Sequence, residues 1–258
     1  DRAAGAMNER PPGAQAAAPP DLSHVDRWVF DLDNTLYPAR CNLFAQIDAR
    51  MTDFIIDRLG RSRDDARRLQ KEYYVSYGTT LSGLMIEHDI PPDDFLAHVH
   101  DIDVSVLDGD AALAQAIGAL PGKRYVFTNG SVRHAENVLG RIGLDGLFDD
   151  IFDIRAAGFT PKPNRLAYER FLAYSGVAPL RAAMFEDLAQ NLEAAHALGM
   201  TTVLVASDAE WLSDEPAAKR PARPGDARDA HIHHVTDDLA GFLDGALTGA
   251  KGPGDGPR

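Results

Sequence analysis

Short apolar runs alternate with helical patterns along most of this chain, and this alternation constrains the fold more than any other feature. Mostly continuous apolar runs of this kind are typical of buried parallel strands, and they occupy residues 28–30, 124–127, 150–153, 182–185 and 202–205. Helical patterns separate most of them, such as the one that Ser131 begins and Gly143 ends. The sequence therefore predicts an α/β fold with a doubly wound, Rossmann-like parallel sheet, whose ligands bind beyond the carboxyl ends of the strands.

One segment, residues 42–100, breaks this alternation because it contains only helical patterns. Apolar residues recur at helical spacing before Gly60, and three further helices are expected to begin near Ser62, Thr80 and Pro92. We interpret residues 39–103 as an all-helical insertion placed over the active edge of the sheet. A helical layer that simply packs on a sheet face is the alternative.

The two ends of the chain differ in composition from its middle. Residues 1–24 and 249–258 are rich in small residues and Pro and lack apolar periodicity, so we expect a disordered N-terminal extension and a flexible tail. The core of the fold is then formed by residues 25–38 and 104–248. Within it, residues 214–228 contain several prolines and are expected to form a loop.

Composition and charge exclude several classes of function. The 258 residues carry a formal net charge of -13, which repels nucleic acid, so no nucleic-acid polymer is expected as a partner. Cys41 is the only cysteine, which excludes an intrachain disulfide and a thiolate zinc site and fits a reducing cytoplasm. The sequence has neither a membrane-spanning apolar run nor a signal-peptide pattern, so no membrane association is expected.

Two carboxylates, Asp31 and Asp33, follow the first apolar run. If strand geometry persists through Asp33, both side chains point to the same side, because side chains of a strand alternate with a period of two. Such a pair is costly without a cation, and Mg²⁺ prefers carboxylate and carbonyl oxygens. The pair therefore indicates a Mg²⁺ site, and a solvated turn rich in Asp and Asn is the alternative interpretation.

Polar residues also follow three other predicted strands. Thr128 and Asn129 precede a helix N-terminus and can form an anion-binding loop, although the same pattern often serves only as a helix cap. Lys162 stands between two prolines that stiffen the backbone and present it to an anion, unless it is a solvated loop residue. Glu186 and Asp187 directly follow a buried strand, where acids also favour the helix dipole. Together these residues predict one site at a single edge of the sheet.

In their order and context, these residues resemble the four motifs of the haloacid dehalogenase-like hydrolase superfamily over residues 25–205. The motif residues are Asp31-Leu32-Asp33-Asn34-Thr35, Thr128, Lys162 and Glu186-Asp187. The helical insertion resembles the type 1 cap of that superfamily, and we refer to residues 39–103 as the cap. Further segments are similar to the pyrimidine 5'-nucleotidase branch, and they are Thr35-Leu36-Tyr37-Pro38, Tyr77-Gly78-Thr79-Thr80-Leu81-Ser82-Gly83-Leu84, Val99-His100-Asp101-Ile102-Asp103, Phe127-Thr128-Asn129-Gly130 and Glu186-Asp187-Leu188-Ala189-Gln190-Asn191-Leu192. Leu188 departs from that branch, which often has Ser there.

The resemblance implies a catalytic and metal-binding role for each acid. Asp31 would be the nucleophile that forms an aspartyl-phosphate, and Asp33 the general acid and base. Mg²⁺ would be held by a carboxylate oxygen of Asp31, the backbone carbonyl of Asp33 and the carboxylate of Asp187, with Glu186 acting through water.

It also implies which groups would bind the substrate. Thr128, the backbone N–H of Asn129 and Lys162 would bind the phosphoryl oxygens and stabilise the transition state, which makes Lys162 both a phosphate-binding and a catalytic residue. Thr79 and Thr80, in the Gly-containing turn of the cap, are expected to approach the nucleoside.

The function implied by the resemblance is that of a Mg²⁺-dependent phosphatase for small phosphorylated metabolites. A pyrimidine 5'-nucleotidase acting on nucleoside monophosphates such as UMP and CMP is favoured over an enzyme for sugar phosphates or phosphoglycolate. The acid at Asp33 argues against a dehalogenase. A phosphomutase would need a sugar-binding cap, and nothing in the sequence identifies one. A non-catalytic protein that binds a phosphometabolite is a further alternative. Cap closure is expected to hinge near Pro38 and Asp103.

Histidines and tyrosines of the cap receive mainly structural interpretations. His98 and His100 do not share a helix face, so we expect them at the surface or at a hinge. Tyr73, Tyr74 and Tyr77 can stack on a base, or they can pack in the core of the cap with their hydroxyls at the surface.

Overall fold

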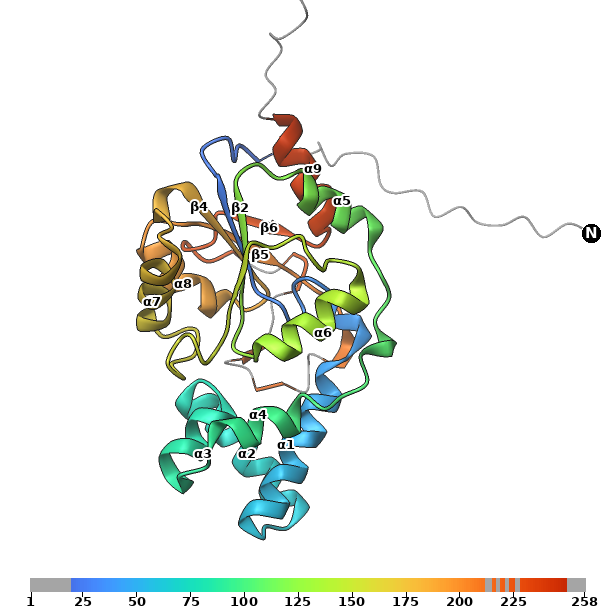
Figure 1. Ribbon diagram of the computed structural model, residues 1–258, viewed down its shortest axis with the longest axis vertical. Coiled ribbons are helices and arrows are strands. Elements are labelled where there is room, and N and C mark those ends of the chain that lie inside the picture. Colours follow the sequence, from blue (N-terminus) through green and yellow to red (C-terminus); the bar gives the residue numbers. More distant parts are fainter. Residues whose placement is uncertain (1–19, 212–214, 217–218, 221–222, 226–227, 250–258) are drawn as a thin grey trace, which may run out of the picture.

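The computed structural model describes residues 20–211, 215–216, 219–220, 223–225 and 228–249, in which a parallel sheet with flanking helices stands above a group of four helices (Figure 1). Most of the predicted N-terminal extension and of the predicted tail lies outside the described residues. The same holds for residues 214, 217–218, 221–222 and 226–227 of the predicted loop.

The sheet has six parallel strands in the order β3-β2-β1-β4-β5-β6. They are β1 (Arg27–Phe30), β2 (Lys123–Phe127), β3 (Asp150–Phe152), β4 (Ala182–Glu186), β5 (Thr201–Val205) and β6 (His234–Thr236). The chain leaves β1 in one direction to reach β2 and β3 and returns to its other side as β4, so the order reverses beside β1. This arrangement confirms the predicted α/β, doubly wound parallel sheet, and it places the expected ligand site at the carboxyl ends of β1 and β4.

Helices cover both faces of the sheet because successive strand residues point to opposite sides. Phe30 packs in the core beneath α5 (Ala111–Ala119), α6 (Val132–Ile142) and α9 (Leu239–Gly249), whereas Val29 packs beneath α7 (Arg165–Ser175) and α8 (Ala189–Ala197) (Figure 1). Three short 3₁₀ turns, η1 (Ala39–Cys41), η2 (Val104–Val106) and η3 (Pro179–Arg181), complete the described elements. In this part of the chain, no helix combines the length and apolar character that crossing a membrane requires.

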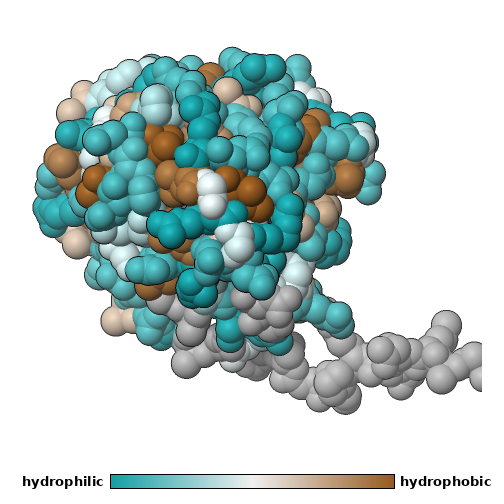
Figure 2. Space-filling view, turned by 90° about the horizontal axis from the view of Figure 1, so that it is seen from below, coloured by the Kyte–Doolittle hydropathy of each residue, from teal (hydrophilic) through white to brown (hydrophobic). Residues whose placement is uncertain are grey.

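The cap contains α1 (Phe44–Leu59), α2 (Arg63–Tyr77), α3 (Thr80–His88) and α4 (Pro92–Val99). The predicted helix ends are confirmed where they were specified: Gly60 ends α1 with a positive φ, and Ser62 caps α2 by accepting a hydrogen bond from the Asp65 N–H. Apolar residues of all four helices form a separate core, which Ile154 of the sheet domain joins. Seen from below relative to Figure 1, the surface is mostly hydrophilic, with apolar side chains gathered among the polar ones (Figure 2).

Candidate active site

Asp31 and Asp33 lie at the end of β1 and line the same cavity between sheet and cap. The Asp31 N–H continues the β1–β4 ladder by donating to the Phe185 carbonyl over 2.9 Å. The condition that strand geometry persists through Asp33 is not met, because a hydrogen-bonded turn begins at once: the Leu36 N–H donates to the Leu32 carbonyl over 3.0 Å, and Asn34 has a positive φ. The two carboxylates therefore reach the cavity from a turn and do not stack along one strand.

Lys162 lies at the centre of the site, where it binds two of the predicted acids. Its ammonium donates to Asp31 Oδ1 over 2.8 Å, to Glu186 Oε1 over 2.7 Å and to the Phe127 carbonyl over 2.7 Å. The lysine is 1% exposed and Glu186 is fully buried, so this is an ion triad inside the protein. All three ammonium protons are used, which fixes the Asp31 carboxylate relative to the strand ends.

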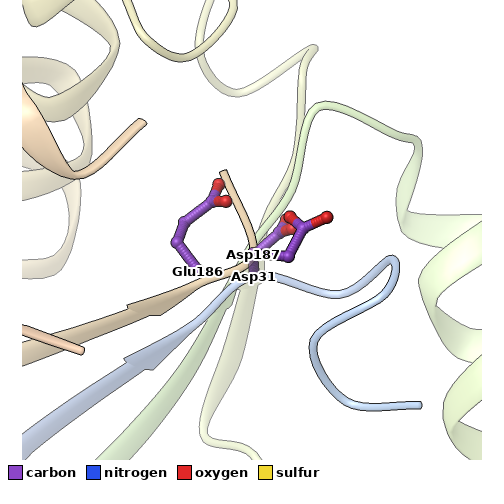
Figure 3. A group of neighbouring side chains, drawn as sticks. All are labelled: Asp31, Glu186 and Asp187. Atoms are coloured by element: carbon purple, nitrogen blue, oxygen red, sulfur yellow. The ribbon is translucent and has the colours of Figure 1, made fainter. Parts of the chain in front are cut away.

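A cluster of three carboxylates surrounds this lysine. Oxygens of Asp31, Glu186 and Asp187 lie within 4.8 Å of one another, and all three residues are buried. The Asp31 and Asp187 carboxylates lie together, whereas Glu186 is turned to the other side (Figure 3). Burial and the Glu186 charge raise the pKa of Asp31 to about 7, despite Lys162. Burial, with Glu186 and Asp31, raises the pKa of Asp187 well above its ordinary value.

The donor set of this cluster fits a hard divalent cation. The site holds one lysine and three carboxylates, so it carries excess negative charge although it is buried. Burial and this excess charge together raise the pKa values of Asp31 and Asp187. Mg²⁺ binds through oxygens and would remove this excess. Glu186 is less free than Asp31 and Asp187, because its two oxygens also accept from Asn191 Nδ2 over 2.7 Å and from the Leu188 N–H over 3.0 Å.

Asp33 is held by a second group of side chains. The Tyr37 hydroxyl donates to its Oδ1 over 2.7 Å, and His134 Nε2 lies 2.8 Å from the same oxygen. The His134 ring stacks on His100 with centroids 4.4 Å apart, and His100 Nδ1 lies 2.9 Å from Ser131 Oγ. The surface position expected for His100 is wrong, because its ring lines the cavity. The alternative, a hinge position, stays a prediction, since His100 lies at the end of α4, where the cap joins the core.

These contacts set the charge state of Asp33. Burial alone would raise its pKa, but the nearby His134 and the hydrogen bonds from His134 and Tyr37 outweigh burial, so the pKa of Asp33 is lowered. The sequence contains a signal for each of these two partners of Asp33. Tyr37 follows Asp33 by only four residues within the turn after β1, and His134 is a polar residue on the apolar face of α6.

The loops after β2 and β3 are tied to each other. The Asn129 side chain donates to the Lys162 carbonyl over 3.1 Å and accepts from the Lys162 N–H over 2.8 Å. Thr128 Oγ1 accepts from the Gly130 N–H over 2.9 Å, which leaves the hydroxyl proton free to be donated. The structure thus brings together the predicted residues of all four strand ends in one cavity, lined by Asp31, Thr128, Asn129, Lys162 and Asp187 among others.

The cap supplies the opposite wall of the cavity, including Thr79 and Thr80. Their hydroxyls have partners within the cap, since Thr79 accepts from the Ser82 N–H over 3.1 Å and Thr80 donates to the Gln70 carbonyl over 3.1 Å. Their approach to a substrate stays a prediction.

The three tyrosines of the cap have different positions. Tyr74 lines the cavity, whereas Tyr73 and Tyr77 pack edge to face in the core of the cap, with ring centroids 5.4 Å apart. The packing interpretation therefore applies to Tyr73 and Tyr77, and stacking of Tyr74 on a base stays a prediction.

Residues that follow β5 also line the cavity, although no pattern in the sequence predicts this position. Trp211 donates from Nε1 to the Ala39 carbonyl over 2.6 Å, and Glu215 pairs with Lys71 of α2 over 3.0 Å. The described residues of the predicted loop over 214–228 thus contact the cap.

Comparison with known proteins identifies the family. The haloacid dehalogenase-like hydrolase family matches residues 26–199, and a second HAD hydrolase-like family matches residues 159–241. The chain belongs to the haloacid dehalogenase-like hydrolases.

Among individual proteins, the chain is 29% identical to Phosphate metabolism protein 8 of Saccharomyces cerevisiae over 208 residues, 72% of this chain and 64% of that protein. It is 45% identical to Enolase-phosphatase E1 of Frankia alni over 62 residues, 24% of this chain and 25% of that protein. The chain therefore spans less than two thirds of the length of these relatives.

Solved structures show the same fold at low sequence identity. CbbY from Rhodobacter sphaeroides in complex with phosphate has a TM-score of 0.57 at 18% identity, covering 85% of this chain and 99% of that chain. L-2-haloacid dehalogenase from Xanthobacter autotrophicus has a TM-score of 0.53 at 16% identity, covering 85% and 97%. These likenesses define the architecture only, since the same fold carries different chemistries.

The excess of buried carboxylates predicts a pH-dependent effect of Mg²⁺ on stability. Because folding raises the pKa of Asp31 from about 4 to about 7, the metal-free folded state binds more protons than the unfolded state. Stability contributed by this group is therefore lost as pH rises through that interval. Mg²⁺ binds the deprotonated cluster, so it should stabilise the protein more at about pH 8 than at about pH 5. At the higher pH the Mg²⁺ increment should be about 2.7 kcal/mol when the Mg²⁺ concentration is 100 times the Kd at that pH.

Denaturant unfolding with and without Mg²⁺ at both pH values measures this effect. Asp187→Asn should raise the stability of the metal-free protein at the higher pH and remove most of the Mg²⁺ increment. Asp145→Asn, at an exposed position, is the matched control and should change neither quantity. An equal Mg²⁺ increment at both pH values would contradict the assignment.

Proposed function

We propose that this protein is a Mg²⁺-dependent phosphatase that hydrolyses small phosphate monoesters through an aspartyl-phosphate on Asp31. The observation that carries the proposal is the buried Asp31 carboxylate, which Lys162 holds beside the oxygen cluster, with the separately hydrogen-bonded Asp33 in the same cavity. One carboxylate is thus positioned to attack and the other to exchange protons.

The proposed reaction has two steps at phosphorus. First, an Asp31 carboxylate oxygen attacks the phosphorus in line, the ester P–O bond breaks, and Asp33 donates a proton to the leaving oxygen. Second, Asp33 accepts a proton from a water that attacks the same phosphorus, which releases inorganic phosphate and regenerates Asp31. The lowered pKa of Asp33 means that its carboxylate carries no proton near neutral pH before the substrate binds. A bound dianionic phosphoryl group would raise that pKa and so favour the proton needed in the first step.

Residues of the other strand ends would hold the phosphoryl group. The Thr128 hydroxyl has a proton to donate, and the Asn129 N–H belongs to a loop that its own side chain fixes to the Lys162 backbone. Lys162 would bind a phosphoryl oxygen by exchanging one of its three present acceptors. These donors match the charge that develops on the transferred group.

The implied metal would bind to groups on β1 and β4. Asp31 and Asp187 offer carboxylate oxygens, the turn after β1 offers the Asp33 carbonyl, and Glu186 would act through water. When bound, Mg²⁺ supplies charge neutralisation between the anionic nucleophile and the anionic substrate.

The favoured substrate is a pyrimidine nucleoside 5'-monophosphate such as UMP or CMP. The similarity of the cap segments supports this choice, and the leaving-group side of the cavity combines aromatic residues, such as Tyr74 and Trp211, with polar ones. Sugar phosphates and phosphoglycolate are the alternative substrates. Release of phosphate from a panel of these esters, with Mg²⁺ and with EDTA, tests the function, and full activity of the metal-stripped protein would contradict it.

The two catalytic carboxylates should respond differently to removal of charge. Asp31→Asn should abolish turnover because an amide is a poor nucleophile. Asp33→Asn keeps the nucleophile and should slow turnover by roughly 10²–10⁴-fold. With para-nitrophenyl phosphate, whose leaving group hardly needs protonation, Asp33→Asn should give a burst of nitrophenol and trapped phosphoprotein. Rapid-quench kinetics measures the burst, and substantial steady-state activity of Asp31→Asn in a clean preparation would refute the covalent mechanism.

Tyr37 should act as a positioning residue for Asp33. Tyr37→Phe removes one donor from Asp33 and keeps the ring, so kcat for a nucleoside monophosphate should fall roughly tenfold. The same change should leave kcat for para-nitrophenyl phosphate nearly unaffected, because that leaving group needs little help from an acid. Tyr174→Phe, which removes an exposed hydroxyl bonded to Asp150, is the control. Equal losses with both substrates would show that Tyr37 acts on something other than proton transfer.

A further inference from the structure

A lysine from the segment after β5 lines the cavity on its cap side. Lys219 is 6% exposed, and its ammonium donates to the Gly78 carbonyl over 3.2 Å. It also lies 4.7 Å from the centre of the Tyr74 ring, a cation–π distance. Because both neighbours belong to α2 or the turn that ends it, Lys219 faces the part of the cavity opposite the strand ends.

The three lysines of the cavity wall differ in how their charges are compensated. Lys162 pairs with Asp31 and Glu186, and Lys71 pairs with Asp48 over 2.7 Å and with Glu215 over 3.0 Å. For Lys219, no ion pair with any described carboxylate is found. Among the described residues, the direct contacts of the Lys219 ammonium are therefore a carbonyl and a ring, and no carboxylate touches it.

Such an arrangement is costly in the absence of a ligand. Burial lowers the pKa of Lys219, although Glu186 opposes this effect. An ammonium has three protons to donate, and among the described residues the Gly78 carbonyl takes one. An oxygen acceptor that enters the cavity would satisfy a further proton and compensate the buried charge.

We propose that Lys219 is a second anchor for the substrate, whose ammonium donates a hydrogen bond to an oxygen acceptor on the leaving group. This inference rests on the proposed function of the site, because it assigns the phosphoryl group to the strand ends and the leaving group to the cap side. The acceptor is a carbonyl or carboxylate oxygen, as on a pyrimidine base or on phosphoglycolate. The face of the Tyr74 ring contacts the ammonium and would hold it in place.

Binding measurements on the full chain test this role without turnover. In the Asp31→Asn background with Mg²⁺, calorimetry would compare the affinities of UMP, phosphoglycolate and inorganic phosphate with and without Lys219→Met. Lys219→Met should weaken binding of UMP or of phosphoglycolate at least about tenfold. It should change the affinity for inorganic phosphate by no more than about twofold. The ligand that loses affinity identifies the source of the acceptor oxygen. Lys219→Gln, which keeps a donor, should give an intermediate loss.

Lys123→Met at an exposed position of β2 is the matched control and should change no affinity. The inference is overturned if Lys219→Met leaves both organic ligands unaffected, if inorganic phosphate loses affinity equally, or if neither organic ligand binds. Denaturant midpoints of the variants are compared to exclude a loss of folding. If Lys219→Met does not fold, the binding measurements use Lys219→Gln in its place. Failure of the proposed function is distinguishable, because it appears as absence of phosphate release by the unmodified chain.

Discussion

The buried ion triad formed by Lys162, Asp31 and Glu186 is the interaction on which the rest of the site depends. It joins the ends of β1 and β4 to the loop after β3, at the place where strand order reverses. Removing the lysine would leave buried carboxylates without a partner, a change that typically costs about 3–5 kcal/mol. Addition of Asp187 leaves negative charge in excess, so the same contacts that order the strand ends also create a place for a divalent cation.

In the proposed function, the residues at this edge of the sheet bind only phosphate and metal, so selectivity for the leaving group would come from elsewhere. The cap closes the cavity from the other side, and residues after β5 complete its wall through Trp211, Glu215 and Lys219. His100, at the end of α4, also connects the cap to the site, since its ring stacks on His134 beside Asp33. Asp33, the proposed general acid, is therefore in contact with groups whose position depends on the cap, which would couple proton transfer to enclosure of the substrate.

Local pattern was sufficient to predict the parallel sheet, the four cap helices and the residues at four strand ends, because each leaves a periodic or stop signal in the sequence. The bounds of β6 were not predicted, since His234–Thr236 is short and polar. His134 and Lys219 were missed because their positions follow from contacts between distant segments. The reason given for the position of Asp33 does not hold, because a hydrogen-bonded turn, and not a continuing strand, carries it into the cavity.

The central claim is that phosphate passes through the carboxylate of Asp31. Borohydride reduction of protein quenched during turnover, followed by mass spectrometry of its peptides, tests this directly, because an acyl-phosphate is reduced to the alcohol whereas a free carboxylate is not. The account predicts homoserine at position 31 when a phosphate ester and Mg²⁺ are present and none when the ester is omitted. Sustained turnover with reduction at another residue, or with no reduction at Asp31, would contradict it.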